Sequence, residues 1–436
     1  MKQFITLSLL LFAAAAQAQP QAEKSYSLLE LKSMAIMNYE AIRIALFEAK
    51  QARLETDALA ATRLPRLDAE ASYTYLSETA SIDLKIPPLV DRSITLGDGH
   101  NYSTGVIASV PLFTGFRLSS AVEMKKEAEL IAKQTFEGTA TEVRNKVALY
   151  YHKALTAENA VDIVEKQRAV LAKNLRTAKE LQEHAQLLPY DTLQLSNRMM
   201  ELEVQRENAI SAKRHAIYVL MELTGSAEYF DIEESAPNEL AEAALSLDSL
   251  TAIAEENRYE FQNLRSQERI TGLAIRESKA DYYPQVSAFA GYRYGKPGIN
   301  QFANEWMGYF TGGIQLSWNL WSWGADSKET EKREIDMEKN RLRSQQLRRS
   351  IRMQLAAMKE DLRVIQTRME LTERRIVQER AKQNIVQSRF QQGLATATEV
   401  VDAETALTVA ELSLEQEQID YSVALTKLAS ILGKDL

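Results

Sequence analysis

The chain has 436 residues, a formal net charge of −8 and no cysteine. Its acidic balance disfavours a nucleic-acid partner, because nucleic acids attract basic surfaces. The lack of cysteine excludes disulfides, thiolate metal sites and a lipid anchor on an N-terminal cysteine.

The polar residues show no pattern that is typical of catalysis. The four histidines are scattered without metal-ligand spacing, and no phosphate-binding loop or nucleophile elbow follows a predicted strand. The many carboxylates are interleaved with lysine and arginine, as on the solvated faces of helices. We therefore expect no cofactor, no metal and no enzymatic activity.

Residues 1–18 have the features of a secretory signal peptide. Lys2 provides the positive charge, residues 4–16 form an apolar run, and Ala16-Gln17-Ala18 fits the cleavage rule, so the mature chain is expected to begin at Gln19. An N-terminal membrane anchor is the alternative, but the run is too short to span a bilayer. No later segment approaches 18 apolar residues, so the mature chain either is soluble outside the cytoplasm or enters a membrane as strands.

An apolar stripe predicts a helix over residues 27–64, which Pro65 ends. Residues 67–75 then alternate between apolar and polar side chains, which predicts a strand with one face of each kind. Prolines and glycines predict a loop over 77–101, and residues 102–112 alternate again. A long helix follows from Gly115 to about Leu188, with a turn at Pro189 and a further helix to Leu223.

The same order recurs later in the chain. The segment from Ala325 to Gln392 contains neither glycine nor proline, which predicts one helix roughly 100 Å long. Its apolar residues have the alternating spacing of four and three that is typical of a coiled-coil seam. The same spacing occurs 208 residues earlier, for example at Val143 before Ile351. The duplication predicts repeat 1 over 19–225, a linker over 226–245 and repeat 2 over 246–436.

Each repeat supplies two strands of about ten residues, the length that a tilted strand needs to cross a bilayer. Aromatic residues gather near the strand ends, as in the girdles of membrane barrels. An ordinary antiparallel sheet with one wet face and an aromatic core is the alternative. Four strands cannot close a barrel, so several copies of the chain would be needed. The expected membrane-interface residues are Trp306, Trp318, Trp321, Trp323, Tyr73, Tyr75, Tyr102, Tyr292 and Tyr294.

This order of elements, given twice after a signal peptide, resembles the TolC family of outer-membrane efflux channels. The local signatures are Leu64-Pro65, Tyr283-Pro284, the segment 110–115 (Val-Pro-Leu-Phe-Thr-Gly), Gln392-Gly393-Leu394 followed by the segment 399–403, and Leu223 with Gly225.

The resemblance implies a mainly helical fold with membrane strands. Long antiparallel coiled-coil helices form an α-barrel, and four strands per chain contribute to a twelve-stranded β-barrel in a homotrimer. It implies a passive exit duct for small molecules or proteins in a tripartite efflux or type I secretion system. The implied partners are outer-membrane lipid, a periplasmic adaptor (membrane fusion protein) and an inner-membrane pump. The implied location is the cell outer membrane, with a periplasmic helical extension.

The resemblance also assigns the functional residues. Two turns at the far ends of the long helices would dock the adaptor. The pore constriction would be formed by Glu399 and Asp402, with Asp191 as the carboxylate of the first repeat, and crowding in the trimer would raise some of their pKa values. Solvated carboxylates on the outer wall are the alternative. The tip residues are Gln392, Gly393 and Leu394 in repeat 2 and His184, Ala185 and Gln186 in repeat 1.

This chain departs from the family pattern at the gate. Phe390 and Ala395 stand where the family carries a tyrosine and an arginine that tie the closed mouth. Two other classes of protein share some of these features: a periplasmic adaptor, which would need a lipoyl-like β module that the sequence does not show, and a secreted structural coiled coil, which would not need four amphipathic strands.

Overall fold

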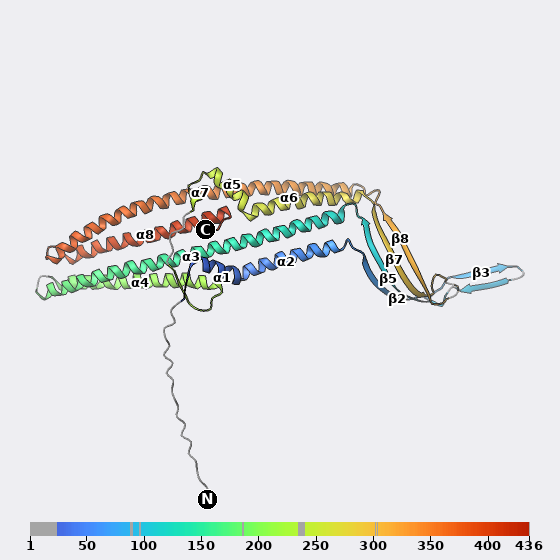
Figure 1. The fold of residues 1–436 in the computed structure, drawn as a ribbon, viewed down its shortest axis with the longest axis horizontal. Coiled ribbons are helices and arrows are strands. Elements are labelled where there is room, and N and C mark those ends of the chain that lie inside the picture. Colours follow the sequence, from blue (N-terminus) through green and yellow to red (C-terminus); the bar gives the residue numbers. More distant parts are fainter. Residues whose placement is uncertain are drawn as a thin grey trace, which may run out of the picture.

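The computed structural model describes residues 24–87, 90–95, 97–184, 187–233, 240–300, 302 and 304–435. The predicted signal peptide and the tip residues Ala185 and Gln186 lie outside the described residues. The molecule is elongated, with long helices at one end and a four-stranded sheet at the other (Figure 1).

Both repeats run through the same order of helices and strands. Repeat 1 contains α1 (Leu28–Asn38), α2 (Glu40–Ala61), β2 (Arg66–Tyr75), β5 (His100–Phe113), α3 (Arg117–Glu183) and α4 (Pro189–Thr224). Repeat 2 contains α5 (Leu247–Asn257), α6 (Tyr259–Ser278), β7 (Gln285–Lys296), β8 (Met307–Ser317), α7 (Ala325–Gln391) and α8 (Ala397–Leu432). The short elements are β1 (Ser25–Tyr26), β3 (Ser81–Ile86), β4 (Val90–Thr95), β6 (Asp231–Ile232) and the 3-10 turns η1 (Ala241–Ala244) and η2 (Lys279–Tyr282).

The long helices confirm the mainly helical fold that was predicted. Both α3 and α7 have 67 residues, which corresponds to roughly 100 Å each. Helix α7 starts after Gly324, which has a left-handed backbone, and α4 starts at Pro189, whose fixed φ suits the first turn of a helix. Among the described residues, no helix is long and apolar enough to cross a membrane.

The predicted helix over 27–64 is two helices, and this expectation was wrong. Tyr39 has an extended backbone between α1 and α2, and Arg258 breaks α5 from α6 in the same way. Neither glycine nor proline marks these breaks. The Asn38 side chain instead donates a hydrogen bond of 2.8 Å to the carbonyl of Thr224, so the end of α4 sits against the break. Gly433, at the end of α8, packs against the backbone of Arg258, which a Cβ atom at position 433 would approach to 2.9 Å.

The predicted loop over 77–101 was also wrong in part, because it contains the antiparallel hairpin β3–β4. This hairpin extends beyond the end of the sheet (Figure 1). Strands β1 and β6 form a separate parallel pair that ties the start of repeat 1 to the segment after α4.

The four-stranded sheet is antiparallel in the order β2-β5-β7-β8. Each strand continues one helix of the layer beside it: α2, α3, α6 and α7 lie next to one another in the same order. Pro111 lies in the central strand β5, where it would remove a ladder hydrogen bond, but the register shifts directly after it, between Pro111 and Phe113. Strands β2 and β8 are the free edges within one chain.

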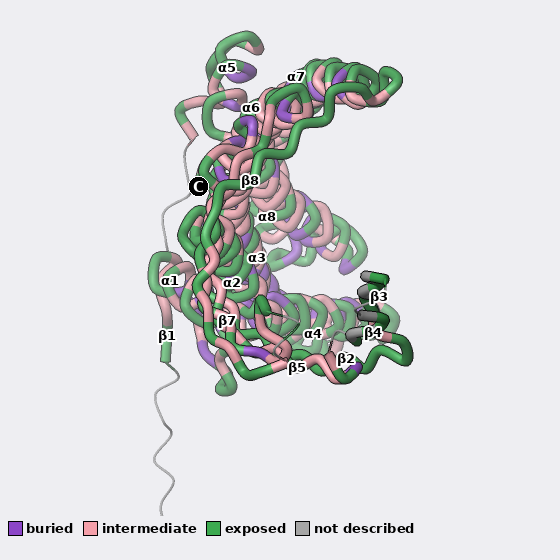
Figure 2. Tube along the Cα trace, turned by 90° about the vertical axis from the view of Figure 1, so that its right-hand side faces the viewer, coloured by how far each residue is buried: buried purple, intermediate pink, exposed green. Residues whose placement is uncertain are grey.

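In the half of the molecule away from the sheet, the hairpins α3–α4 and α7–α8 pack against each other along α3 and α8. Seen from the side turned by 90°, α7, α8, α3 and α4 follow one another along an arc (Figure 2). In the described parts of the chain, the buried hydrophobic residues form three clusters. One joins α1, α3 and α4; a second joins α5, α7 and α8 and contains the predicted seam residues Ile351 and Leu355.

The third cluster lies near the two turns and joins all four long helices, so we name it the tip cluster. It consists of Val164, Leu171, Ala178, Leu195, Leu202, Phe390, Ala397 and Val400.

Candidate functional site

The turn between α7 and α8 is built on Gly393, which has a φ of 72°. This left-handed backbone lets the Leu394 amide donate a hydrogen bond of 2.8 Å to the Arg389 carbonyl, which closes α7. Thr396 then caps α8. In the turn of repeat 1, His184 follows α3 directly. Together the two turns expose Leu394, Leu188 and Tyr190, each with more than 60% of its surface accessible.

The three predicted constriction carboxylates lie within the first two helical turns after these tips. The Glu399 carboxylate accepts hydrogen bonds from the Thr396 amide (2.7 Å) and hydroxyl (3.2 Å). Asp191 accepts one of 3.1 Å from the Leu188 amide, so it has the same place in α4 that Glu399 has in α8. Asp402 is exposed one turn further along.

The hydrogen bonds from Thr396 hold the pKa of Glu399 below its ordinary value, because they favour the charged form. The rise in pKa expected from crowding concerns three copies of the chain and stays a prediction.

The two residues at the gate positions are packed inward. Phe390 is fully buried in the tip cluster, and Ala395 packs against it. The Phe390 ring therefore holds the two hairpins together by apolar contact. One polar contact also joins them at the tips: the Thr398 hydroxyl donates a hydrogen bond of 2.9 Å to the side-chain oxygen of Gln194.

A row of polar contacts between α3 and α8 was not predicted. The side-chain amides of Asn174, Gln167 and Asn159 donate hydrogen bonds to the carboxylates of α8. The pairs are Asn174 with Glu404 (2.5 Å), Gln167 with Glu411 (3.0 Å) and Asn159 with Glu415 (3.4 Å). Burial raises the pKa of Glu404 to about 7, and it also raises the pKa of Glu415. The three glutamates of α8, at spacings of seven and four residues, repeat on one helix face, and this was the signal that could have found the row.

The sheet separates apolar from polar side chains. The register places Val110, Ala288 and Ile314 in one cross-strand row, with Ser109, Phe289 and Gly313 in the next row, which faces the opposite side. On the apolar face Phe310, Ile314 and Leu316 leave more than 60% of their surfaces accessible in the single chain. On the polar face Glu70 and Arg293 lie 3.9 Å apart on either side of Gly105.

The predicted interface aromatics lie in two groups along the sheet. Trp306 contacts both Tyr102 and Tyr294 at the end near the β3–β4 hairpin, with ring centroids 5.7 and 5.2 Å away. Tyr73 and Tyr75 lie beside them. Trp318, Trp321 and Trp323 lie at the helical end, where the Trp318 indole donates to the Tyr282 carbonyl. Tyr292 lies inside its strand and contacts Phe310 instead of marking an end.

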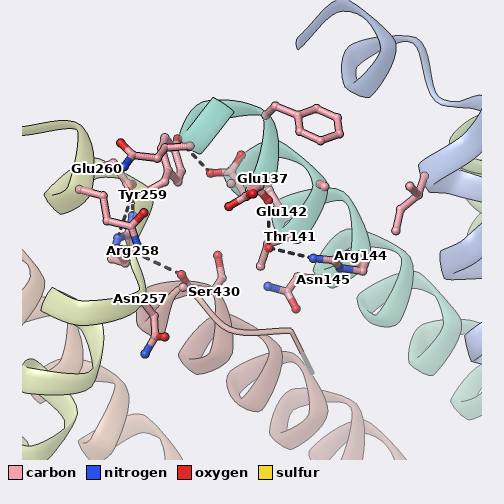
Figure 3. A pocket seen from close by; sticks show the side chains of 17 residues that line it. Glu137, Thr141, Glu142, Arg144, Asn145, Asn257, Arg258, Tyr259, Glu260 and Ser430 are labelled. Atoms are coloured by element: carbon pink, nitrogen blue, oxygen red, sulfur yellow. Dashed lines mark hydrogen bonds and ion pairs between the residues drawn. The ribbon is translucent and has the colours of Figure 1, made fainter. Parts of the chain in front are cut away.

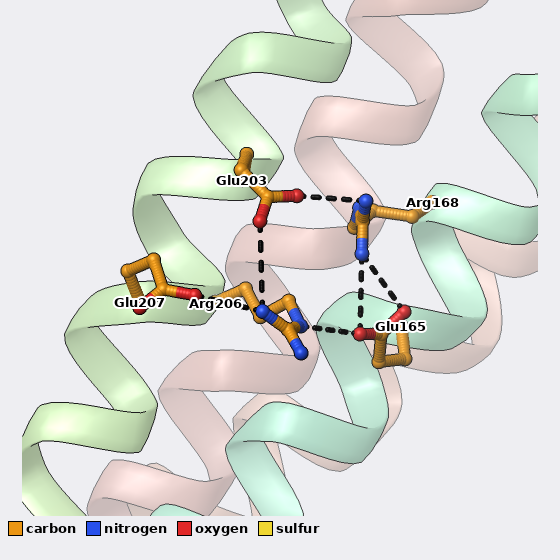
Figure 4. A network of polar contacts seen from close by, with 5 residues as sticks. All are labelled: Glu165, Arg168, Glu203, Arg206 and Glu207. Atoms are coloured by element: carbon orange, nitrogen blue, oxygen red, sulfur yellow. Dashed lines mark hydrogen bonds and ion pairs between the residues drawn. The ribbon is translucent and has the colours of Figure 1, made fainter.

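Two other polar regions lie away from the tips, an ion-pair network between α3 and α4 and a cavity beside α6. A network of five side chains clamps α3 to α4: Arg168 and Arg206 bridge Glu165 and Glu203, and Arg206 also pairs with Glu207 (Figure 4).

A cavity of about 500 Å³ lies where α6 begins beside α3 and the end of α8 (Figure 3). Its Tyr259 hydroxyl lies 3.3 Å from Glu142, and burial raises the pKa of Tyr259 to about 12. In the described part of the chain, no group of acidic or histidine side chains could hold a metal.

Comparisons with solved structures find the same fold in several channels. CusC matches with a TM-score of 0.77 and 17% identity, over 94% of this chain and 93% of its own. The outer membrane protein VceC of Vibrio cholerae matches with a TM-score of 0.73 and 15% identity, over 94% of this chain and 96% of its own. The outer membrane channel MtrE of Neisseria gonorrhoeae matches with a TM-score of 0.73 and 15% identity, over 93% of this chain and 89% of its own. At these identities the likeness concerns the fold.

A comparison with curated protein sequences finds no match. The model of the outer membrane efflux protein family matches residues 31–184 and 250–434, which together are more than half of the chain. These two segments contain all four strands of the sheet, helix α3 and the hairpin α7–α8, whereas α4 lies between them. The chain belongs to the outer membrane efflux protein family.

Proposed function

We propose that three copies of this chain form the outer-membrane exit duct of a tripartite efflux or type I secretion system. The observation that carries the proposal is the sheet register, which gathers apolar side chains from all four strands on one face, with Ile107 and Phe289 on the other. A face of this kind suits lipid, and the aromatic groups at the two ends of the sheet suit the two membrane interfaces.

Closure requires other copies of the chain. Strands β2 and β8 have free edges, and unpaired backbone groups are not tolerated in lipid. Pairing of β8 with β2 of the next copy would satisfy them and give twelve strands in a trimer. Helix α4 also exposes an apolar stripe at coiled-coil spacing, which a neighbouring copy would cover. The stripe consists of Leu193, Met200 and Val204.

Each repeat, 19–225 and 246–436, would supply two strands and one helical hairpin, with 226–245 as the link between them. The hairpins would then form a tunnel that leads away from the membrane. Its two turns per chain lie at the far end from the sheet (Figure 1). Their exposed apolar side chains support docking of a periplasmic adaptor there, at Gln392, Gly393 and Leu394 and at the turn that contains His184. An inner-membrane pump would drive export.

The narrowest part would lie just behind these tips. Three copies would bring Glu399, Asp402 and Asp191 around one opening, and a ring of carboxylates favours cations because it repels anions. Phe390 and Ala395 supply no hydroxyl or guanidinium to close this mouth.

The test uses detergent-purified protein. Native mass spectrometry should give a trimer, and this trimer in a planar bilayer should conduct, prefer cations and be blocked by multivalent cations from the helical side. Glu399→Ala/Asp402→Ala should lose the preference and the block. The matched control is Glu331→Ala/Glu334→Ala, two exposed carboxylates with the same spacing at the sheet end of α7; it should behave as the parent.

A stable monomer or dimer would overturn the barrel. A double variant at 399 and 402 with unchanged selectivity would place the constriction elsewhere.

A further inference from the structure

One carboxylic acid lies in the interior where the two hairpins meet. Glu404 of α8 is 3% exposed, next to the apolar tip cluster. Its Oε1 accepts a hydrogen bond of 2.5 Å from the side-chain amide of Asn174 in α3, which is 2% exposed. The Asn174 oxygen in turn accepts one of 3.1 Å from Gln387 in α7. A chain of hydrogen bonds thus crosses from α7 through α3 to α8.

The fourth long helix contributes the only charged group that acts on Glu404 in the described part of the chain. Arg198 of α4 is 4% exposed, and its charge lowers the pKa of Glu404 without a direct hydrogen bond between them. Its Nη1 donates to Glu201 at 2.8 Å, while its Nε and Nη2 are buried without a partner. The group that contacts Glu404 from α3 is the neutral amide of Asn174, and α7 contributes the neutral amide of Gln387 behind it.

The other carboxylates of α8 have different surroundings. Glu411, two turns further along, forms an ion pair of 2.6 Å with Arg380 in addition to its bond from Gln167. Glu399 and Asp402 are exposed at the tip. Only Glu404 combines a position between all four long helices with nearly complete burial and no ion pair. Burying a carboxylate of this kind costs more in its charged form than in its neutral form.

We propose that Glu404 is a proton-dependent latch between the hairpins α3–α4 and α7–α8. With its proton, Glu404 fits the packed arrangement described above, and the hairpins stay together behind the tips. Without it, a charge is left between the helices, and separation of α8 from α3 lets water reach it. This inference rests on the proposed function. In the proposed duct, protonated Glu404 would hold the closed mouth together, the role that the resemblance gives to a tyrosine and an arginine.

The direction of the pH dependence follows from linkage. Burial holds the pKa of Glu404 at about 7 in the packed state, and a hydrated carboxyl in the separated state would titrate near its ordinary value. The packed state is therefore favoured most at acid pH, and this advantage is lost as pH rises through the interval between the two pKa values. Between pH about 5.5 and about 8 the ratio of separated to packed hairpins should rise about tenfold or more.

The experiment measures the distance between the hairpins directly. Because the chain has no cysteine, Gln194→Cys and Thr398→Cys give two unique positions for spin labels, one on each side of the tip contact. Electron paramagnetic resonance on the purified, labelled full-length protein in detergent should show a short distance at pH about 5.5 and a growing population of longer distances at pH about 8.

Two variants test the assignment to Glu404. Glu404→Gln keeps an oxygen that can accept from Asn174 but cannot ionise, so it should give the short distance at both pH values. Arg198→Gln removes the charge that favours ionised Glu404, so the change should move to higher pH. Glu411→Gln is the matched control on the same helix and should respond as the parent does.

The latch would be overturned if the distance between the two spin labels in the parent protein did not change with pH. It would also be overturned if the Glu404→Gln variant showed the same change of distance with pH as the parent. The distances do not depend on conduction. A pH-dependent distance in a protein that does not conduct would therefore support the latch while overturning the proposed duct.

Discussion

At the scale of single residues, Gly138 shows how a poor helix former is required by a distant contact. It lies inside α3, where glycine is unfavourable, and the ring of Tyr259 from α6 packs directly on it. A Cβ atom at position 138 would come within 2.1 Å of the Tyr259 ring, so no other residue fits without movement. The contact locks α6 of repeat 2 onto α3 of repeat 1.

We predict that Gly138→Ala destabilises the protein by about 1–3 kcal/mol, because overpacking forces the ring or the helix aside. The matched control is Gly272→Ala in the interior of α6, where the nearest atom, of Met337, would be 3.6 Å from the new Cβ. This change should stabilise the protein by up to about 1 kcal/mol through helix propensity. Urea unfolding followed by circular dichroism measures both, and equal effects of the two variants would contradict the packing argument.

At the scale of elements, the order of the strands across the sheet, β2-β5-β7-β8, is the same as the order of the helices that adjoin them, α2-α3-α6-α7. Each strand of the sheet runs into one long or medium helix of the adjoining layer, so the curvature of the sheet and the arc of the helices continue one another (Figures 1 and 2). The turns from strand to long helix use two successive left-handed residues in both repeats. They are Gly115-Phe116 in the first and Trp323-Gly324 in the second. The aromatic residue of each pair is strained, a cost of about 1–3 kcal/mol that the surrounding structure has to offset.

The two faces of β7 give a prediction at this scale. Ala288 lies on the apolar face and its neighbour Ser287 on the polar one. Ala288→Arg should cost about 2–4 kcal/mol, because it places a charge toward the bilayer midplane. Ser287→Arg, the same charge one residue away, should cost little in an aqueous lumen. Folding titrations into lipid vesicles would compare them, and a larger loss for Ser287→Arg would show that the faces are reversed.

At the scale of the whole molecule, the sheet and the helical tips lie at opposite ends. The sheet with its β3–β4 hairpin lies at one end, and the turns at Gly393 and beside His184 lie at the other (Figure 1). The long helices separate these ends by roughly 100 Å. Changes at one end are therefore expected to leave the other intact.

Two glycines test this separation. Gly393 and Gly97 both have a positive φ and open space around them, the first at the tip and the second in the turn before β5. Gly393→Trp should abolish export by blocking the adaptor, while trimer formation and membrane insertion persist. Gly97→Trp should leave export unchanged. Efflux from cells and the trimer band on native gels are the measurements, and normal export by Gly393→Trp would refute docking at this tip.

The sequence by itself determined the elements whose signals are local. The absence of breakers between Gly324 and Gly393 predicted α7 almost to the residue, and alternation predicted the strands and their two faces. The β3–β4 hairpin had such a signal in Ile82, Leu84 and Ile86, but the surrounding prolines and glycines favoured a loop.

The helix breaks at Tyr39 and Arg258 were decided only by the tertiary structure, because the end of α4 or α8 packs there. The burial of Glu404 was decided in the same way. It needs α3, α4, α7 and α8 together, and these helices come from both repeats. From the sequence alone, a carboxylate in a helix is expected to be solvated. Glu404 is removed from water only by contacts with residues more than 200 positions away in the chain, such as Asn174.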